Sequence, residues 1–445
     1  MEVVIEELVI YGFIALLCLG IISYYLLSRN KKSKVVEKKI QTAKEEGRFE
    51  PVSLHPYIDL NACIGSGACV KACPEKDIIG LVDGKAMVIN ASSCIGHGAC
   101  FHSCPVEAIS LRIGTETRGV DLPHILPNYE TNIKGIYIAG ELGGMGLIKN
   151  STKQGKRAVK NIVQDKKPSK EGVLDLAIIG AGPAGIAAAL NAKKHKITFT
   201  VLEQDTLGGT VFTFPRQKVV MTRPMKLPLY GKMKLFDTSK EELLGIWQKV
   251  LSENNIVIQE HKKVEQITPL ANGDFKLEIK NAEPVLAQQV LIAIGRRGTP
   301  RKLNIPGEES SKVAYRLLEP EWISGKKILV VGGGDSAIES ALMLMKNNEV
   351  TISYRKEIFA RIKPKNNTQI MRAIEGKEIN MLYNSVVLEI KEEEVTIGFN
   401  NREETMQLPN DLVYIFAGGE LPIQFLKNAG INVEKKFGKI VKKYK

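Results

Sequence analysis

The feature that most constrains how this chain can fold is a twelve-residue segment that occurs twice. The segment CIGSGACVKACP begins at Cys63, and CIGHGACFHSCP begins 31 residues later at Cys94, with eight of the twelve positions identical. Each copy holds three cysteines and ends in proline. Between the copies, residues 80–90 predict two short strands that turn at Asp83-Gly84. The sequence therefore predicts two similar loops whose thiols bind metal.

Residues 56–114 resemble the bacterial two-cluster ferredoxin, whose motif is C-x2-C-x2-C-x3-C-P. Cysteine holds the first, third and fourth motif positions in both copies, whereas Ser66 and His97 hold the second positions. In such ferredoxins the fourth cysteine of each run ligates the other cluster. The resemblance thus implies two iron–sulfur clusters, with Cys63, Cys69, Cys104 and Ser66 around the first and Cys94, Cys100, Cys73 and His97 around the second.

Ser66 and His97 replace thiolates with ligands of different chemistry. A serine hydroxyl is a hard and reluctant ligand for iron, so the first cluster could lose one iron and become 3Fe-4S instead of 4Fe-4S. A neutral imidazole at His97 should raise the reduction potential of the second cluster, as histidine does in Rieske centres.

Two other interpretations of the cysteines stay open beside this one. Structural zinc could use the C-x3-C pairs that begin at Cys69 and Cys100, but it leaves Cys63, Cys94 and the recurring prolines unexplained. Disulfides are disfavoured in the cytoplasm. Cys18 lies outside both copies, in an apolar run, and is predicted to be a packing residue.

An uncharged run of 20 residues, Leu8–Leu27, precedes this module. A helix of that length spans about 30 Å, the thickness of the hydrocarbon core of a bilayer. A cleaved signal peptide has positive charge before its apolar run, but Glu2, Glu6 and Glu7 stand there, and basic residues follow from Arg29 onward. We therefore expect a single-pass anchor in the cell membrane, rather than a buried core helix, with the rest of the chain in the cytoplasm.

A dinucleotide-binding pattern begins after residue 170. The apolar run Val173–Ile179 predicts a buried strand, and a glycine-rich turn and a helix follow it. The turn has the pattern G-x-G-x-x-G, formed by Gly180, Gly182 and Gly185, which lets the backbone approach a pyrophosphate at the helix N-terminus. Glu203 ends the next predicted strand, where a carboxylate can accept a ribose hydroxyl.

A second unit of the same kind follows the predicted strand Lys327–Val331. Its three pattern positions are Gly332, Gly334 and Ala337. The strand after its helix ends in Tyr354-Arg355-Lys356, where an acidic residue would favour NAD. Arg355 suits the 2′-phosphate of NADPH, which favours NADPH over NADH, and Arg361 could add a second contact.

The pair of units resembles the thioredoxin reductase family over residues 171–430. The resemblance implies FAD in the first unit, with Gly209 among its contacts, and NADPH in the second. In that family a redox dithiol lies shortly before the second glycine pattern, but here the matching stretch is 313–318 and no cysteine follows Cys104. Dithiol exchange with thioredoxin therefore lacks its nucleophile. In this respect the chain resembles the bacillithiol disulfide reductase-like branch.

Such flavoproteins end with a strand, a Gly-Asp pair and a helix whose N-terminus faces the flavin. The resemblance finds that segment before the first strand, at residues 115–170. Gly140 and Glu141 stand in place of Gly-Asp, and a helix from about Asn150 could direct its positive end at the flavin. We interpret this order as a circular permutation of the FAD domain. The alternative is a separate small domain at 115–165.

The expected fold class is α/β, with two Rossmann-like domains for FAD and NAD(P)H, the first circularly permuted. An α+β bacterial ferredoxin domain and one N-terminal transmembrane helix complete it. The expected segments are 1–28 transmembrane anchor, 29–55 charged linker, 56–114 ferredoxin-like domain, 115–170 permuted FAD-closing segment, 171–310 FAD-binding domain, 311–408 NAD(P)H-binding domain and 409–445 return to the FAD domain.

We expect an NADPH-dependent oxidoreductase that relays electrons between NAD(P)H, FAD, the clusters and a protein redox partner, in a direction that the sequence leaves open. Two alternatives are direct reduction of a small molecule, such as a low-molecular-weight disulfide, at the flavin, and a redox- or oxygen-sensing anchor subunit. The net charge of +13 allows contact with an anionic membrane, whereas no reader motif points to nucleic acid. The oligomeric state stays open, a homodimer included.

Overall fold

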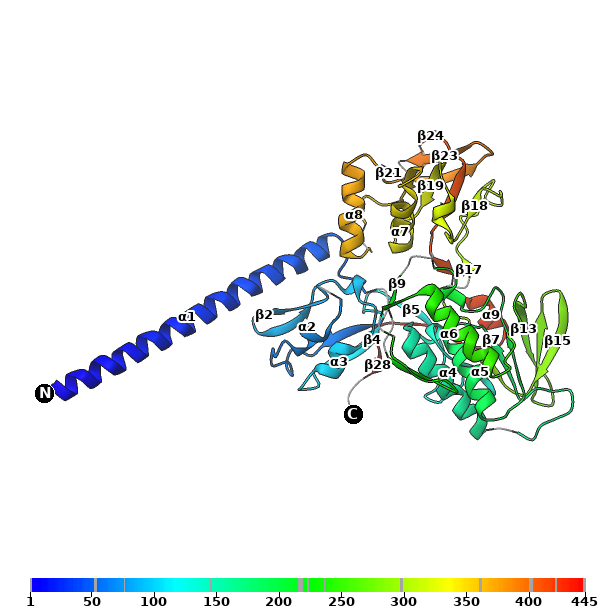
Figure 1. Cartoon of the computed structure of the whole chain (residues 1–445), viewed down its shortest axis with the longest axis horizontal. Helices are drawn as coiled ribbons and strands as arrows, with labels where there is room; N and C mark the ends of the chain where they lie inside the picture. Colours follow the sequence, from blue (N-terminus) through cyan, green and yellow to red (C-terminus); the bar gives the residue numbers. More distant parts are fainter. Residues whose placement is uncertain are drawn as a thin grey trace. The chain divides into compact units, whose positions relative to one another are not determined.

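The computed structural model describes residues 2–51, 54–75, 77–144, 146–165, 167–214, 219–221, 224–235, 237–296, 299–359, 362–399, 403–420 and 422–442. The chain forms two compact units. One comprises residues 1–118 with 437–445, and the other comprises residues 119–436. The chain therefore passes between the units twice, once at each end of the larger one (Figure 1).

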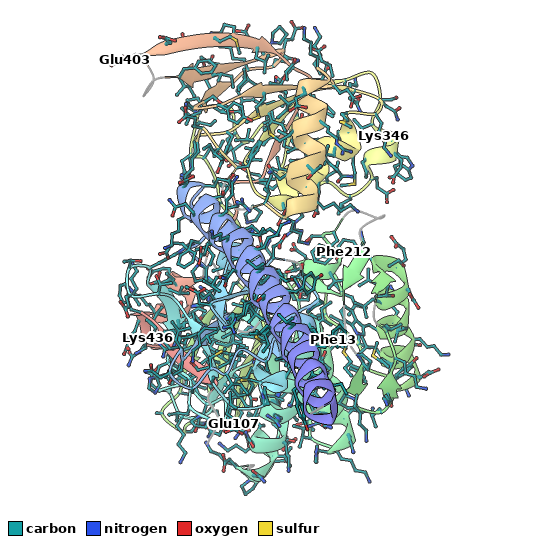
Figure 2. The ribbon with its side chains drawn as sticks, turned by 90° about the vertical axis from the view of Figure 1, so that its left-hand side faces the viewer. Phe13, Glu107, Phe212, Lys346, Glu403 and Lys436 are labelled. Carbon is teal, nitrogen blue, oxygen red and sulfur yellow. The ribbon has the colours of Figure 1, made fainter. Side chains whose placement is uncertain are left out.

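A single helix, α1 (Glu2–Glu45), forms the N-terminal part of the smaller unit. Its apolar residues from 10 to 27 are exposed; Phe13, for example, projects from the ribbon with 66% of its surface exposed (Figure 2). Within the part of the chain that the structure describes, α1 is the one helix long and apolar enough to cross a membrane, by length and composition.

The second half of α1 differs from the charged linker predicted at 29–55. The helix continues through Glu45, and Ile40 and Ala43 are buried. Ile40 packs with Val82 and Ile89, and Val36 joins this cluster. Residues 36, 40 and 43 recur at helical spacing, so they form a narrow apolar stripe within a sequence otherwise rich in Lys and Glu. This stripe fixes the helix to the module that follows.

The module itself has a three-stranded antiparallel sheet and a hairpin. The sheet has the order β1 (His55–Ile58), β4 (Ile109–Ile113) and β28 (Lys439–Lys442), and the hairpin joins β2 (Ile79–Val82) to β3 (Lys85–Val88). Val82 pairs with Lys85 across a two-residue turn in which Asp83 and Gly84 both have positive φ. This is the geometry of a tight hairpin turn, so the predicted hairpin is confirmed. Three short helices complete the module: α2 (Ala68–Ala72), η1 (Ala91–Ser93) and α3 (Ala99–Ser103).

The first part of the larger unit is built on a four-stranded parallel sheet. Its order is β6 (Ile136–Ile138), β16 (Val290–Ile292), β7 (Leu176–Ile179) and β8 (Phe199–Leu202). Every residue of β6, β7 and β16 is buried, with at most 5% of its surface exposed, as expected for strands covered on both faces. The helices of this part are α4 (Ile148–Gln164), α5 (Pro183–Lys194), α6 (Lys240–Glu253) and α9 (Ile423–Asn428), with short helices η2 (Glu141–Gly143) and η3 (Gly209–Val211).

Smaller antiparallel sheets surround this one. They are β13 (Val264–Pro269), β14 (Phe275–Ile279) and β15 (Ala282–Ala287); β9 (Val219–Met221) with β12 (Asp237–Ser239); β10 (Met225–Leu227) with β11 (Gly231–Met233); and β5 (Val120–Pro123) with β27 (Val433–Lys436). Because β6 lies in the main sheet and α4 packs on α5, residues 136–138 and 148–164 are built into this domain, whereas residues 115–118 of the same predicted segment belong to the smaller unit.

A second parallel sheet forms the next part. Its order is β18 (Val313–Ala314), β25 (Leu412–Ile415), β19 (Lys327–Val331), β20 (Glu349–Ser353) and β21 (Ile379–Leu382). The remaining elements are α7 (Asp335–Leu344), α8 (Pro364–Glu375), η4 (Pro320–Trp322), the antiparallel sheet of β22 (Val386–Ile390), β23 (Glu394–Phe399) and β24 (Glu404–Pro409), and the pair β17 (Thr299–Pro300) with β26 (Gly419–Glu420).

The C-terminal part departs from the predicted return to the FAD domain at 409. Strand β25 inserts between β18 and β19, so residues 412–415 belong to the second sheet. Strand β27 then pairs with β5, and β28 pairs with β4 in the smaller unit. The reason is that Leu412–Ile415 is an apolar strand buried between two parallel neighbours, and such a central strand belongs to the sheet that buries it.

Candidate redox cofactor sites

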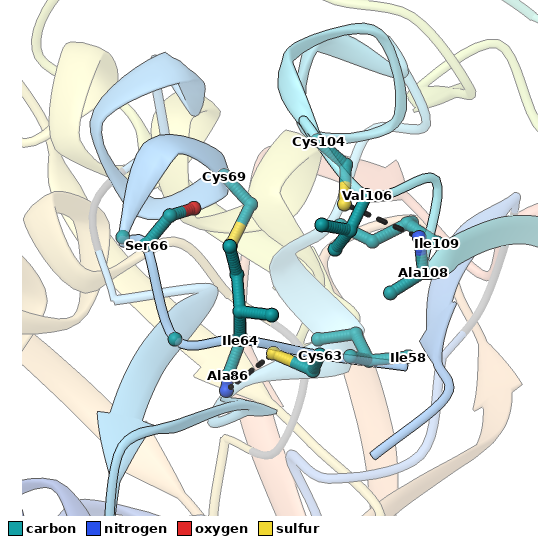
Figure 3. Close-up of a pocket in the computed structure, with 12 residues that line it drawn as sticks. Ile58, Cys63, Ile64, Ser66, Cys69, Ala86, Cys104, Val106, Ala108 and Ile109 are labelled. Atoms are coloured by element: carbon teal, nitrogen blue, oxygen red, sulfur yellow. Dashed lines mark hydrogen bonds between the residues drawn. The ribbon is translucent and has the colours of Figure 1, made fainter. Parts of the chain in front are cut away.

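Three thiols and one hydroxyl from both copies of the repeated segment surround one hollow. Cys63, Cys69, Cys104 and Ser66 line it, together with apolar side chains that include Ile64 and Val106 (Figure 3). The volume is about 300 Å³ including the open solvent at its mouth. This is the set that the ferredoxin resemblance implied for the first cluster. Soft thiol donors converging on one hollow fit an iron–sulfur cluster.

Backbone N–H groups point at two of these sulfurs. Ala86 donates to Cys63 Sγ at 3.4 Å, and Ala108 donates to Cys104 Sγ at 3.3 Å (Figure 3). Lys85 Nζ donates to the Cys63 carbonyl at 2.6 Å. Hydrogen bonds to ligand sulfurs help set the potential of such a cluster. Sequence patterns missed these donors because every residue carries a backbone N–H.

A second group of thiols comprises Cys94, Cys100 and Cys73. Burial raises the pKa of Cys94 to about 11 and that of Cys100 to about 12, and the Cys73 thiol acts electrostatically on both. Cys94 and Cys100 would both be thiolates at neutral pH only beside a compensating cation. All seven cysteines lie in the described residues and are thiols rather than disulfides.

Ser66 and His97 occupy equivalent loops. Gly65 and Gly67 flank Ser66, and Gly96 and Gly98 flank His97; all four glycines have φ between +69° and +73°. A β carbon at Gly65 would meet the Gly84 carbonyl oxygen at 1.8 Å, so this approach requires glycine. The two positions differ in exposure, since Ser66 is exposed and His97 is half-buried.

The first glycine pattern lies between β7 and α5, as predicted. Gly180 has φ +102°, and a β carbon at Gly185 would lie 1.8 Å from the Gly180 carbonyl oxygen. The buried carboxylate of Glu203 accepts hydrogen bonds from the N–H of Ala181 at 2.6 Å and of Asp205 at 3.0 Å. Burial raises the pKa of Glu203 despite these bonds.

Gly209 and Gly140 both reach this glycine-rich turn. A β carbon at Gly209 would contact Gly182 at 3.4 Å, and one at Gly140 would contact the side chain of Ala184 at 3.1 Å. Gly140 and Glu141 follow β6, and the Gly140 N–H donates to Gln154 Oε1 in α4 at 2.8 Å. The structure therefore brings together the residues predicted to contact the first dinucleotide.

The second pattern lies between β19 and α7, and β19 has the predicted bounds. Gly332 has φ +136°, and Ala337 is fully buried against it. Arg355 is exposed just after β20, beside Tyr354, whose ring lies over Gly333. Arg361, the other predicted phosphate contact, lies outside the described residues.

The stretch that matches the family's dithiol, residues 313–318, holds hydrogen-bonding groups. Tyr315 donates to Glu308 at 2.7 Å, and Arg316 forms an ion pair with Asp205 at 2.9 Å. Asp205 lies three residues after the end of β8, in the FAD-binding part, so Arg316 links the two nucleotide-binding parts. This ion pair could not be predicted from the sequence, because neither Arg316 nor Asp205 belongs to a motif.

The fold and these sites define a class of protein, a flavin and nicotinamide nucleotide oxidoreductase joined to an iron–sulfur module. The pyridine nucleotide-disulphide oxidoreductase family matches residues 177–443, more than half of the chain. The chain belongs to that family. Residues 55–105 match the 4Fe-4S dicluster domain. The protein is therefore an NAD(P)H-dependent FAD oxidoreductase with an iron–sulfur domain.

Individual relatives agree with this assignment. A ferredoxin–NADP reductase from Ignicoccus hospitalis is 28% identical over 271 residues, which cover 59% of this chain and 83% of the relative. The bacilliredoxin reductase Bdr of Bacillus subtilis is 27% identical over 267 residues, 59% of this chain and 82% of the relative. The structure of bacillithiol disulfide reductase Bdr from Staphylococcus aureus has a TM-score of 0.52 and 23% identity, covering 60% of this chain and 85% of that one. The resemblances to both families are confirmed.

Proposed function

We propose that this protein is a membrane-anchored, NADPH-dependent flavin and iron–sulfur oxidoreductase that passes electrons between NADPH and a protein redox partner. The observation that carries the proposal is the gathering of Cys63, Cys69 and Cys104 around one hollow, in a chain whose dithiol stretch has Arg316 instead of cysteine. A bound flavin exchanges two electrons with a nicotinamide and releases them singly, which suits it to supply one-electron clusters.

The chain's own residues hold the FAD in this proposal. Gly180 and Gly182 bring the backbone to the pyrophosphate, at the N-terminus of α5. Glu203 still has acceptor positions for a ribose hydroxyl, because a carboxylate has about four lone-pair sites. Gly140 and Glu141 close the site from the transposed segment, so the FAD domain is circularly permuted. Helix α4 has no acidic residue in its first turn, which leaves its positive end for the flavin.

The nicotinamide nucleotide is NADPH in this proposal. Gly332 and Gly334 receive its pyrophosphate, and Arg355, exposed at the end of β20, pairs with the 2′-phosphate. A guanidinium binds phosphate in a bidentate manner and stays charged at any physiological pH.

Two clusters complete the chain of cofactors. The ligands of the first cluster are Cys63, Cys69, Cys104 and Ser66. The ligands of the second cluster are Cys94, Cys100, Cys73 and His97. The anchor is the apolar half of α1. Because α1 is unbroken and its apolar stripe begins at Val36, nine residues after Leu27, roughly 14 Å of helix separates the membrane span from the cluster-bearing module. The partner is accordingly expected at the membrane.

The test is an anaerobic titration of the detergent-solubilised full-length protein with NADPH, recording flavin absorbance and cluster EPR together. We expect the flavin and clusters to be reduced in step. A Cys69→Ala, Cys100→Ala double variant should keep flavin reduction and lose both EPR signals. Bleaching of the flavin without any cluster signal in the wild type would refute the relay.

A second candidate is direct reduction of a low-molecular-weight disulfide at the flavin. The names of the relatives in Bacillus subtilis and Staphylococcus aureus favour it. This activity should survive the Cys69→Ala, Cys100→Ala changes, whereas the relay should not. Turnover of a low-molecular-weight disulfide by the double variant at the wild-type rate would therefore favour the second candidate.

A further inference from the structure

The two proposed cluster sites have similar sequences but differ in one ligand position, which we call the corner: it is Ser66 in the first site and His97 in the second. Ser66 and His97 lie in loops with the same glycine geometry, at the same position of the duplicated segment. The His97 site can therefore serve as a control for the Ser66 site. Any difference in ligand binding between the two sites comes from the side chain at this position and its surroundings.

The surroundings of Ser66 are open to solvent. Ser66 is exposed, whereas Cys63 and Cys69 are buried. Two apolar residues at the same hollow are also exposed, Ile64 by 63% and Val106 by 37%. Figure 3 shows Ser66 and the three thiols around the hollow, contributed by two separate stretches of chain, residues 63–69 and Cys104. A small molecule can therefore reach the serine corner without displacing a buried thiol.

The Ser66 ligand differs chemically from the three cysteine ligands of the first cluster. A hydroxyl is a hard ligand, and iron–sulfur clusters prefer soft thiolates. A thiol also ionises far more readily than an alcohol, with a pKa near 8.5. A thiol from solution is thus a better ligand than Ser66, and the corner offers it access.

We propose that the Ser66 corner of the first cluster is an exchangeable binding site for a small thiol. The incoming thiol gives its proton to the Ser66 oxygen, a sulfur–iron bond forms and the oxygen–iron bond breaks, so no electron is gained or lost. This inference rests on the proposed ligands of the first cluster. It adds a ligand site, with low-molecular-weight thiols as its class, to the electron-relay function.

The test uses the full-length protein, purified anaerobically with its clusters, and 2-mercaptoethanol as the probe. EPR and Mössbauer spectra of the reduced protein are recorded during a titration with the thiol. In the wild type we expect a saturable change in the spectrum of one cluster only. Ser66→Cys should abolish the change because a fixed thiolate fills the corner, whereas Ser66→Ala should keep it.

His97→Cys is the matched control, and it should leave the response to the thiol intact. Equal FAD content in all variants shows that each one has folded. Full iron and sulfide content without any spectral response in the wild type would overturn this inference alone, as would a Ser66→Cys variant that responds like the wild type. Absence of iron and labile sulfide from the wild type would overturn the electron-relay function as well.

Discussion

Gly155 in α4 lies so close to Ala184 in α5 that a β carbon at position 155 would come within 2.0 Å of the Ala184 carbonyl oxygen. Gly155 belongs to the segment that precedes the first dinucleotide fold in sequence, and Ala184 belongs to the glycine-rich turn of that fold. Only glycine permits such an approach of two helices. The contact therefore fixes α4 directly against the predicted pyrophosphate site.

Replacing this glycine should loosen the FAD domain. Gly155→Ala should lower the free energy of unfolding by roughly 1–3 kcal/mol, because overpacking forces the two helices apart, and it should reduce the FAD retained on purification. Gly245→Ala is the control, since Gly245 lies in α6 with open space around its Cα and alanine there favours the helix by up to about 1 kcal/mol. Equal thermal midpoints and FAD contents for the two variants would show that the helices do not approach so closely.

Glu308 should make the stability of the larger unit depend on pH. Burial alone would raise its pKa, but hydrogen bonds from the Leu303 N–H, Tyr315 and the Asn304 N–H lower it below its usual range. The ionised form is thus the one that the fold favours. Its contribution is complete above the unfolded pKa of about 4.3 and is lost as the pH falls through the lowered folded value.

Glu308→Gln should therefore cost roughly 1–3 kcal/mol of unfolding free energy at neutral pH, with a smaller difference from the wild type below about pH 4. Thermal midpoints by tryptophan fluorescence, measured from pH 7 to well below pH 4, would test this. Glu309→Gln is the control, because Glu309 is exposed and pairs with Lys302 at the surface, where an ion pair contributes little. A Glu308 effect that stayed constant with pH would contradict the assignment.

The parts that the sequence predicted well are those where chemistry demands a residue type at a fixed spacing. The thiols around the first hollow and the glycine-rich turns at Gly180 and Gly332 are of this kind. Asp83-Gly84 is another, because both residues need positive φ in a two-residue hairpin turn.

The parts that it missed depend on tertiary contacts. The stripe of Val36, Ile40 and Ala43 is too narrow to be recognised in a sequence rich in lysine and glutamate. These side chains form a hydrophobic core only because the hairpin packs against them. Strand β28 is a lysine-rich terminal segment that would suit solvent equally well. Lysine is common in edge strands, so only its pairing with β4 identifies it.

Arg355 should decide which nicotinamide nucleotide the enzyme prefers. Arg355→Leu removes a charge-assisted hydrogen bond of about 1.5–3 kcal/mol to the 2′-phosphate. We expect the KM for NADPH to rise by about 10- to 100-fold, with the KM for NADH nearly unchanged. Steady-state oxidation of both nucleotides with an artificial acceptor gives the two constants, and NADH serves as the internal control. An equal rise for both would indicate a general role in folding or binding.

His97 should set the potential of the second cluster. His97→Cys replaces a neutral imidazole with an anionic thiolate, which disfavours the reduced cluster and should lower its reduction potential by on the order of 100 mV. EPR-monitored redox titration of the wild type and the variant measures this. His102→Gln is the control, because His102 is an exposed residue of α3 in the same copy of the repeated segment. If the reduction potential of the second cluster were the same in His97→Cys and in the wild type, His97 would not be one of its ligands.

The docking of α1 on the hairpin should determine how firmly the module is held to the apolar half of α1, the proposed membrane span. Ile40→Asp places a carboxylate in the cluster of Val82 and Ile89, which should cost roughly 3 kcal/mol or more of docking free energy. The freed helix then exposes its lysines, so limited trypsin digestion of the membrane-bound protein should release the catalytic part faster. Val35→Asp is the matched control, since Val35 lies outside the buried stripe and 52% of its surface is exposed. Equal cleavage rates in the two variants would mean that the second half of α1 is a free linker, and the module would then be tethered to the bilayer rather than held beside it.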